Sequence, residues 1–225
     1  MSPQSNPRLS ARSLRLALGE QLVLLEATLQ IHAHEIVALI GDNGAGKTSM
    51  LDLLAGSHQT GSGAVELDGV PLCDVAPHYL AKRIARLDHK PGLYLDLTAR
   101  ENLKLFCQLL DQPCTMEVLD KTLDTVGVRP ADRDRPVRHF SRGMLQRAAL
   151  ARVIASPADI WLLDEPSTGL DASGCAWLAQ LLGAAAQRGV AILLASHDPM
   201  LIALADRTLH LQHGMIQNNF AAGVA

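Results

Sequence analysis

The chain has 225 residues, of which 48% are apolar and only 3% aromatic, and its formal net charge is −3. This length suits one large domain or two small ones, with a core built mainly from aliphatic side chains. The sequence contains no basic run of five or more residues, so it lacks the clustered Lys and Arg that phosphate backbones attract, and we expect no nucleic-acid partner. The four cysteines form no Cys-x-x-Cys pair, so neither a zinc site nor a disulfide framework is expected.

No apolar run approaches the length of about 20 residues that spans a bilayer. The longest apolar stretch, at 175–196, is interrupted by Gln180, Gln187 and Arg188. The first 20 residues hold three arginines but no continuous apolar segment, so we do not expect a secretory signal. We predict instead a short tail followed by a first strand at 9–18.

Apolar runs bounded by turn or charged residues predict most of the secondary structure. The segment 21–31 is expected to belong to an antiparallel pair near the N-terminus. Further along, four short runs predict buried strands of a parallel sheet with crossover helices, at 35–41, 83–87, 159–165 and 190–196. Helical periodicity predicts helices at 98–110, 116–126 and 141–155, the last with Ser141 as its N-cap. The stretch 92–157 is therefore predicted to be almost wholly helical, as an insertion into an α/β fold.

A glycine-rich loop follows the strand predicted at 35–41. Its sequence GDNGAGKT, at 41–48, matches the phosphate-loop pattern G-x-x-x-x-G-K-[ST], and SMLDLLAG after it is typical of a helix. Glycines let backbone N–H groups converge on phosphate oxygens, and the helix directs its positive end at the same anion. Lys47 is predicted to bind the β- and γ-phosphates, and the hydroxyl of Thr48 is predicted to bind Mg²⁺. The predicted ATP-binding residues are Gly41, Asp42, Asn43, Gly44, Ala45, Gly46, Lys47, Thr48 and Ser49.

Two acidic residues end the strand predicted at 159–165. Asp164 and Glu165 are adjacent, so their side chains diverge and can divide the chemistry between them. Asp164 is predicted to hold Mg²⁺, and Glu165 to orient or deprotonate the attacking water. Two acids after a strand are weak evidence alone, since acids often begin surface loops, but a phosphate loop in the same chain favours the catalytic interpretation.

At this point the chain resembles the ATP-binding subunits of ABC transporters. Four further segments carry the resemblance: LTARENL at 97–103, FSRGMLQR at 140–147, STGLD at 167–171 and ASHD at 195–198. They resemble, in the family's order, the segment after the Q-loop, the signature motif, the D-loop and the switch-histidine segment. The resemblance implies a single ABC-type ATPase domain over 1–225. It also implies a RecA-like P-loop core at about 1–91 and 158–225, an N-terminal antiparallel β subdomain, and a helical signature subdomain at about 92–157.

The resemblance also implies how two copies bind ATP. In this family, two copies of one subunit, or one subunit and a homologous ATPase subunit, form a head-to-tail dimer that sandwiches two ATP molecules. The signature segment of one copy faces the phosphate loop of the other, and here that segment comprises Ser141, Arg142, Gly143 and Met144. Exposed N–H groups at a helix start form an anion site, so this arrangement agrees with a helix beginning at Ser141. By the same resemblance, Asp171 belongs to the D-loop, and His197 is the switch histidine that contacts the γ-phosphate and the attacking water.

Three positions depart from the family pattern. Leu18 stands where an aromatic side chain usually stacks on adenine, so we predict weak base discrimination and tolerance of GTP. Arg142 replaces a usual glycine of the signature, although its backbone N–H remains available. His89, in RLDHKPGLY, falls where the Q-loop glutamine normally lies. A histidine there can donate, accept or titrate, so we hypothesise pH-sensitive coupling between about pH 6 and 7.

The combination of HKPGLYLDLTARENL, FSRGMLQRAALAR and DEPSTGLD is most similar to the haem-exporter branch of bacterial cytochrome c maturation. The resemblance implies integral-membrane permease subunits as partners and a position on the cytoplasmic face of the inner membrane. Other small exporter ATPases share much of the pattern. Two alternatives stay open: a soluble ABC-type switch without a membrane partner, and a subunit that binds ATP without hydrolysing it.

Overall fold

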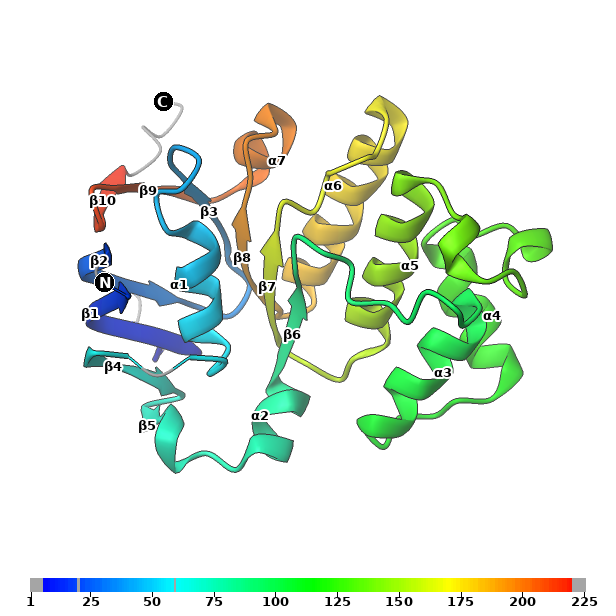
Figure 1. Cartoon of the computed structure of the whole chain (residues 1–225), viewed down its shortest axis with the longest axis horizontal. Helices are drawn as coiled ribbons and strands as arrows, with labels where there is room; N and C mark the ends of the chain where they lie inside the picture. Colours follow the sequence, from blue (N-terminus) through cyan, green and yellow to red (C-terminus); the bar gives the residue numbers. More distant parts are fainter. Residues whose placement is uncertain (1–5, 20, 59, 220–225) are drawn as a thin grey trace.

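The computed structural model describes residues 6–19, 21–58 and 60–219. Within these residues the chain forms two sheets with helices around them (Figure 1). An antiparallel sheet and a mixed sheet in an α/β arrangement confirm the fold class predicted from the sequence.

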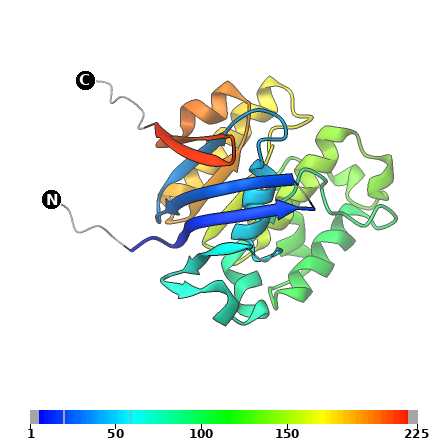
Figure 2. The same ribbon diagram turned by 60° about the vertical axis from the view of Figure 1, so that its left-hand side comes forward.

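The smaller sheet is antiparallel and has the order β2-β1-β4-β5. Its strands are β1 (Leu9–Leu18), β2 (Gln21–Ile31), β4 (Ser62–Leu67) and β5 (Val70–Pro71). β1 and β2 pair antiparallel as predicted, whereas β4 and β5 were not predicted. Figure 2 shows the β1–β2 hairpin lying across α1, with the β9–β10 hairpin beside it. The N–H of Leu25 donates to the carbonyl of Gly214 at 2.8 Å, which ties these two hairpins together.

The larger sheet carries the site and has the order β10-β9-β3-β8-β7-β6. Its strands are β3 (Ile36–Ile40), β6 (Ile84–Leu87), β7 (Ile160–Asp164), β8 (Ala191–Ala195), β9 (Arg207–Gln212) and β10 (Met215–Asn219). The first four match the predicted buried strands to within one residue at each end. They run parallel with β9, and only the edge strand β10 is antiparallel. The carboxyl ends of β3, β7 and β8 therefore meet at one edge of the sheet.

Two apolar cores lie on opposite faces of this sheet. In β3, Val37 and Leu39 face the core under α1 (Lys47–Leu54) and the antiparallel sheet, whereas Ala38 faces the other core. The second core contains residues of α6 (Ala172–Gln187) and α7 (Pro199–Leu204). Strands covered on both faces read as apolar runs, which is why β3, β7 and β8 were found from the sequence. β6 was found although Arg86 interrupts its run.

The region from 92 to 157 contains α3 (Ala99–Leu109), α4 (Met116–Thr125) and α5 (Arg142–Ala155), set apart from the antiparallel sheet in Figure 1. Thr98 and Glu101 form a capping box at the start of α3, and Ser141 caps α5 as predicted. The prediction that this region is almost wholly helical was wrong. Between α4 and α5 the chain forms loops with two short 3-10 turns, Pro130–Asp132 and Val137–His139. Proline at the start of one turn and before the other restricts the backbone there.

Another helix, α2 (Pro77–Arg83), leads directly into β6. A helix long and apolar enough to cross a membrane does not occur in the part of the chain that the structure describes. We propose that residues 92–157 form a helical subdomain and the remaining residues the core.

Candidate functional site

The loop between β3 and α1 is shaped by two close approaches of the backbone to its neighbours. A Cβ atom on Gly41 would lie 2.3 Å from the carbonyl oxygen of Leu211 in β9, so only glycine fits there. Gly46 has φ +102°, and a Cβ atom on it would lie 2.8 Å from the side chain of Val23. The loop therefore packs closely against β2 and β9 and leads directly into α1.

The loop leaves several N–H groups for an external acceptor. Inside it, the N–H of Ala45 donates to the carbonyl of Asp42 at 3.1 Å. The first N–H groups of any α-helix have no partner within the helix, and in α1 these belong to Lys47, Thr48 and Ser49. Converging free N–H groups at a helix start form an anion site that suits a phosphate group.

Lys47 is buried, with 8% of its surface exposed, and its ammonium group folds back over the loop. Its Nζ donates to the carbonyl oxygens of Gly41 at 2.7 Å and Asp42 at 3.1 Å. Nζ also lies 3.1 Å from Nε2 of His197, beyond the end of β8. The positive charge is thus held at the mouth of the loop, where the phosphates of a nucleotide would lie.

Thr48 and Asp164 meet although 116 positions separate them in the chain. The hydroxyl of Thr48 donates to Oδ2 of Asp164 at 2.7 Å. Asp164 ends β7 and is only 3% exposed. A hydroxyl and a carboxylate are the hard oxygen ligands that Mg²⁺ prefers, so these two residues fit a magnesium ion beside the phosphate loop.

Glu165 adopts an uncommon backbone conformation directly after β7. Its φ is +49°, in the left-handed region that side chains other than glycine rarely occupy. Its N–H donates to the carbonyl of Ala195 at 2.8 Å, which holds the turn against β8. Oε1 of Glu165 then lies 3.5 Å from Nε2 of His197. Strain of this kind tends to persist at functional sites, and here it directs the carboxylate toward the histidine.

The two contacts of His197 both involve Nε2 and require opposite protonation of that nitrogen. To accept a hydrogen bond from the Lys47 ammonium, Nε2 must carry a lone pair; to donate to Glu165, it must carry a proton. The shorter distance, 3.1 Å against 3.5 Å, favours acceptance from Lys47 in this arrangement. Lys47, Glu165 and His197 therefore form one cluster at the edge of the sheet.

Residues 24–168 match the ABC transporter family. The chain belongs to this family. Relatives named cytochrome c biogenesis ATP-binding export protein CcmA are similar over nearly the whole length. The relative from Pseudomonas putida KT2440 is 36% identical over 85% of this chain and 90% of its own length. The relative from Methylococcus capsulatus is 32% identical, over 92% of this chain and 99% of its own length.

Solved structures of the same family share the fold. One, described as the ATP binding subunit of an ABC transporter, has a TM-score of 0.84 and 25% identity, over 94% of this chain and 89% of its own. Another, a dimeric ATP-binding cassette in a post-hydrolysis state bound to ADP and Pi, has a TM-score of 0.86 and 23% identity, over 96% of this chain and 100% of its own.

The segment that resembles the ABC signature lies at the start of α5. Ser141 accepts a hydrogen bond from the N–H of Met144 at 3.3 Å, and Arg142 is exposed. A Cβ atom on Gly143 would lie 2.6 Å from the carbonyl oxygen of Gly169, so glycine is required by close packing against the segment 167–171. Among the described residues, no hydrogen bond or ion pair joins this segment to the phosphate loop.

Asp171, predicted to belong to the D-loop, caps α6. Its Oδ1 accepts hydrogen bonds from the N–H of Gly174 at 2.7 Å and from the hydroxyl of Ser173 at 2.9 Å. These bonds, first that of Gly174, hold the pKa of Asp171 below its usual value. Asp171 therefore fixes the chain between Glu165 and α6.

Sequence reasoning missed a buried link between α5 and the turn that follows β7. Nε2 of Gln146 donates to the carbonyl of Pro166 at 2.9 Å, and Gln146 is 4% exposed. It ties α5 to the residue after Glu165. In the sequence, the only sign of this link is a glutamine among the small apolar residues of α5. That sign does not identify the carbonyl group to which the glutamine donates.

His89 and Leu18 are both exposed at the surface. His89 follows β6 and makes no hydrogen bond or ion pair with any residue that the structure describes. It is therefore not brought into contact with Lys47, Glu165 or His197. Leu18 ends β1 and is 50% exposed, in the hairpin beside the phosphate loop.

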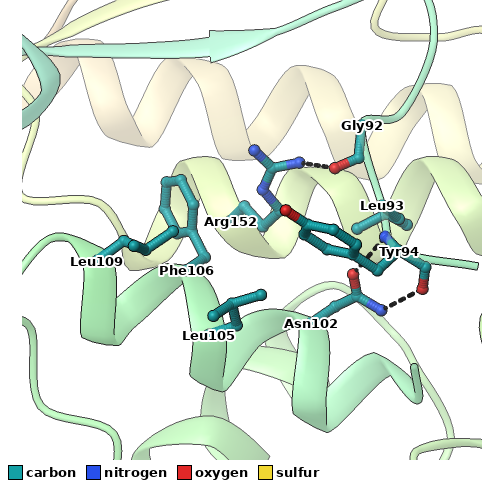
Figure 3. Close-up of a pocket in the computed structure, with 8 residues that line it drawn as sticks. All are labelled: Gly92, Leu93, Tyr94, Asn102, Leu105, Phe106, Leu109 and Arg152. Atoms are coloured by element: carbon teal, nitrogen blue, oxygen red, sulfur yellow. Dashed lines mark hydrogen bonds between the residues drawn. The ribbon is translucent and has the colours of Figure 1, made fainter. Parts of the chain in front are cut away.

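A cleft of about 390 Å³ opens between the segment after His89 and α3 (Figure 3). Leu93 and Tyr94 line it on one side, and Leu105, Phe106 and Leu109 of α3 on the other. Asn102 fixes the loop, because its Oδ1 accepts from the N–H of Tyr94 at 2.8 Å and its amide donates to the Tyr94 carbonyl at 3.0 Å. Tyr94 and Leu109 are each 64% exposed. The cleft is thus a largely apolar surface hollow, separate from the phosphate loop.

Proposed function

We propose that this chain is the ATP-hydrolysing subunit of a membrane exporter that serves cytochrome c biogenesis. The observation that carries the proposal is the meeting of Lys47, Glu165 and His197 beside the Thr48–Asp164 pair. Lys47 supplies a cation that can bind phosphates, and Thr48 and Asp164 supply oxygen ligands for a metal ion. Glu165 and His197 supply a carboxylate and an imidazole that can bind the attacking water. The reaction is the hydrolysis of ATP by water to ADP and phosphate.

In this proposal the chain's own groups bind and orient the reactants. The phosphate loop, Gly41 to Ser49, binds the phosphate chain through its N–H groups. Lys47 exchanges its bonds to Gly41 and Asp42 for phosphate oxygens. Thr48 and Asp164 would hold Mg²⁺, which would supply a Lewis acid that offsets charge developing on the phosphates.

Water activation falls to Glu165 and His197. Glu165 accepts a proton from the attacking water, and its strained turn keeps the carboxylate facing the γ-phosphate position. His197, released from Lys47, hydrogen-bonds the γ-phosphate and the same water. Proton transfer by a positioned side chain typically contributes about 10²–10⁴-fold to the rate, which sets the expected loss when Glu165 is replaced.

A second copy completes each site. We propose a head-to-tail dimer in which Ser141 and the N–H groups of Arg142, Gly143 and Met144 bind the γ-phosphate held by the opposite copy. The exposed start of α5 suits this role, because its free N–H groups have no partner within the helix. Asp171 lies in the segment that packs on Gly143, so it faces the same junction.

The relatives' name supports the assignment to cytochrome c biogenesis, with haem as the proposed cargo. We propose that integral-membrane permease subunits dock on the cleft beside α3, which places the chain on the cytoplasmic face of the inner membrane. An exposed apolar hollow of this kind marks an interaction surface. Leu18, exposed and aliphatic, supports the proposal that GTP is tolerated beside ATP.

The test combines co-purification with one variant. The wild-type chain, co-expressed with the membrane-protein genes that neighbour its own, should co-purify with a polytopic membrane protein and hydrolyse ATP. The Glu165→Gln variant should lose about 10²–10⁴-fold in turnover and accumulate as an ATP-bound dimer. Wild-type protein that shows no turnover with its membrane partner would instead indicate a non-hydrolysing subunit. Turnover without any membrane partner would favour the soluble switch.

A further inference from the structure

Arg152 reaches the cleft beside α3 from the last turn of α5. Its Nη1 donates to the carbonyl oxygens of Gly92 at 2.6 Å and Pro91 at 3.2 Å. The guanidinium carbon lies 4.8 Å from the centre of the Phe106 ring, at cation–π distance. Figure 3 shows this group between Phe106 and Tyr94, with its hydrogen bond to Gly92. The guanidinium is thus fixed in position at the wall of the cleft.

The charge of Arg152 has no counter-ion within the described part of the chain. Two other partly buried arginines contact carboxylates, since Arg83 pairs with Asp159 and Arg207 with Glu35. Arg147 resembles Arg152, because it has a carbonyl partner and a ring but no ion pair among the described residues. Arg152 has carbonyl partners and a ring but no carboxylate within ion-pair distance among those residues. Burial lowers the pKa of Arg152, and the more distant Asp88 offsets this effect only in part. An uncompensated charge at an apolar wall is costly unless a partner supplies the opposite charge.

One edge of the guanidinium remains available for such a partner. The hydrogen bonds to Pro91 and Gly92 use Nη1 alone. Nε and Nη2 of Arg152 make no hydrogen bond to the described residues, and neither is among their buried, unpartnered side-chain nitrogens. Both therefore remain open to solvent. Parallel donors of this kind match the two oxygens of a carboxylate.

We infer that the cleft binds a permease segment that is apolar and carries one Asp or Glu, and that the carboxylate pairs with the Nε–Nη2 edge of Arg152. The inference rests on the proposed function, because the carboxylate belongs to the permease. The apolar side chains of the segment cover Tyr94, Leu105 and Leu109, and exclude water from the ion pair. A pair formed in such surroundings is stronger than one on an open surface.

If Arg152 had a purely structural role, its variants would affect permease binding differently than the carboxylate pairing predicts. If the side chain only held the turn at Pro91 and Gly92, any residue able to donate to those carbonyls would serve. Arg152→Gln keeps a donor and removes the charge, whereas Arg152→Lys keeps both. The carboxylate pairing therefore requires that the Lys variant binds the permease more tightly than the Gln variant does.

The experiment uses the complete complex in a membrane or detergent. A photo-crosslinking amino acid at Leu109, on the exposed rim, identifies the permease peptide in the cleft by mass spectrometry. We expect that peptide to contain an Asp or Glu. Arg152→Gln should weaken complex formation at least about tenfold, and Arg152→Lys should weaken it less than Gln does, because Lys keeps the charge but not the paired donors. An Arg152→Glu chain should regain binding when the permease acid is changed to Lys.

The controls separate the possible failures. Arg138→Gln removes an exposed arginine that pairs with Asp96, and it should change binding less than twofold. Thermal unfolding of each variant verifies that the fold is intact. A crosslinked permease peptide without an acid, or an Arg152→Gln chain that binds as well as wild type, would overturn the inference alone. A chain that carries only the photo-crosslinking residue at position 109, and that crosslinks to no membrane protein, would overturn the proposed function as well.

Discussion

Lys47 and His197 lie within hydrogen-bond distance across the mouth of the phosphate loop, with Nζ and Nε2 3.1 Å apart. The contact joins the residue that is proposed to bind phosphate to the residue that is proposed to sense it. An ammonium group can only donate, so Nε2 must accept, and the ring proton of a neutral His197 must lie on Nδ1. A nucleotide that draws Lys47 away would remove this constraint.

We therefore predict that nucleotide binding changes the hydrogen bonding of Nε2 of His197. In ¹⁵N NMR spectra of histidine-labelled protein, the Nε2 resonance should have the unprotonated, acceptor shift without nucleotide. It should move when a non-hydrolysable ATP analogue and Mg²⁺ are added. The His197→Gln variant assigns the signal. An Nε2 shift that is the same with and without the analogue would contradict the exchange of Lys47 from His197 to phosphate.

The paired substitutions Gly143→Ala and Gly183→Ala should have opposite effects on stability. Alanine in place of glycine normally stabilises a helix by about 1 kcal/mol. A Cβ atom at Gly183, inside α6, would approach nothing closer than a Leu204 methyl at 3.9 Å, so this gain should appear. At Gly143 the Cβ atom would lie 2.6 Å from the Gly169 carbonyl, and the net effect should be a loss of roughly 1–3 kcal/mol. Urea unfolding measures both, and a stabilised Gly143→Ala chain would disprove the close packing.

Thr48 should contribute to ATP binding through its hydroxyl oxygen and not through the volume of its side chain. Thr48→Val keeps the volume and removes the donor to Asp164, so Mg²⁺-dependent affinity for ATP should fall about tenfold or more. Thr48→Ser keeps the hydroxyl and should stay within about threefold of wild type. Titration with ATP in the presence of Mg²⁺ and of EDTA separates the metal from the phosphate contribution. Equal affinities of the Val and Ser variants would exclude Thr48 as a metal ligand.

Asp171 should contribute a pH-dependent part of the stability. Hydrogen bonds from Gly174 and Ser173 lower its pKa in the folded state. Its contribution is therefore present above the reference Asp pKa of about 3.9 and is lost as the pH falls through the folded value. Asp171→Asn keeps an acceptor for the cap but does not titrate. The difference in free energy of unfolding between wild type and this variant should shrink as the pH falls from about 5 to 3, and a constant difference would contradict the prediction.

His89→Gln tests whether the residue that follows β6, before the cleft, requires an imidazole. The side chain is exposed and without a described partner, so the substitution should change the free energy of unfolding by no more than about 0.5 kcal/mol. We expect the two chains to differ in permease-stimulated ATP hydrolysis, because an imidazole and an amide offer different donors and acceptors. Equal stimulation of the two chains would rule out a role for the imidazole of His89 in coupling.

The sequence predicted the central strands because each is apolar on both faces. β3, β7 and β8 lie inside the sheet and are covered on both sides, and their apolar runs stand out from the flanking residues. The edge strand β6 is apolar except for Arg86. β4 and β9 were missed, since each is only six residues long and pairs with a strand far away in the sequence, β4 with β1 and β9 with β3. Long-range pairing of this kind leaves little trace in a short segment.

The residues of the site were predictable where chemistry dictates residue types and spacing, as in the phosphate loop and the acid pair. Contacts made by tertiary approach were not. The close packing of Gly143 on Gly169 and the position of Arg152 over Phe106 depend on how α5 lies against its neighbours. The positive φ of Glu165 was equally invisible, because it is imposed by β8 and not by any local preference of glutamate.

Helix α5 begins at the residues proposed to touch the opposite copy's ATP and bears Arg152 near its other end. Its 14 residues span about 21 Å, and the helix contains no proline or kink signal in its interior. It can therefore act as a rigid lever. A tilt of only about 5° about one end would displace the other by roughly 2 Å, enough to make or break a hydrogen bond at the nucleotide.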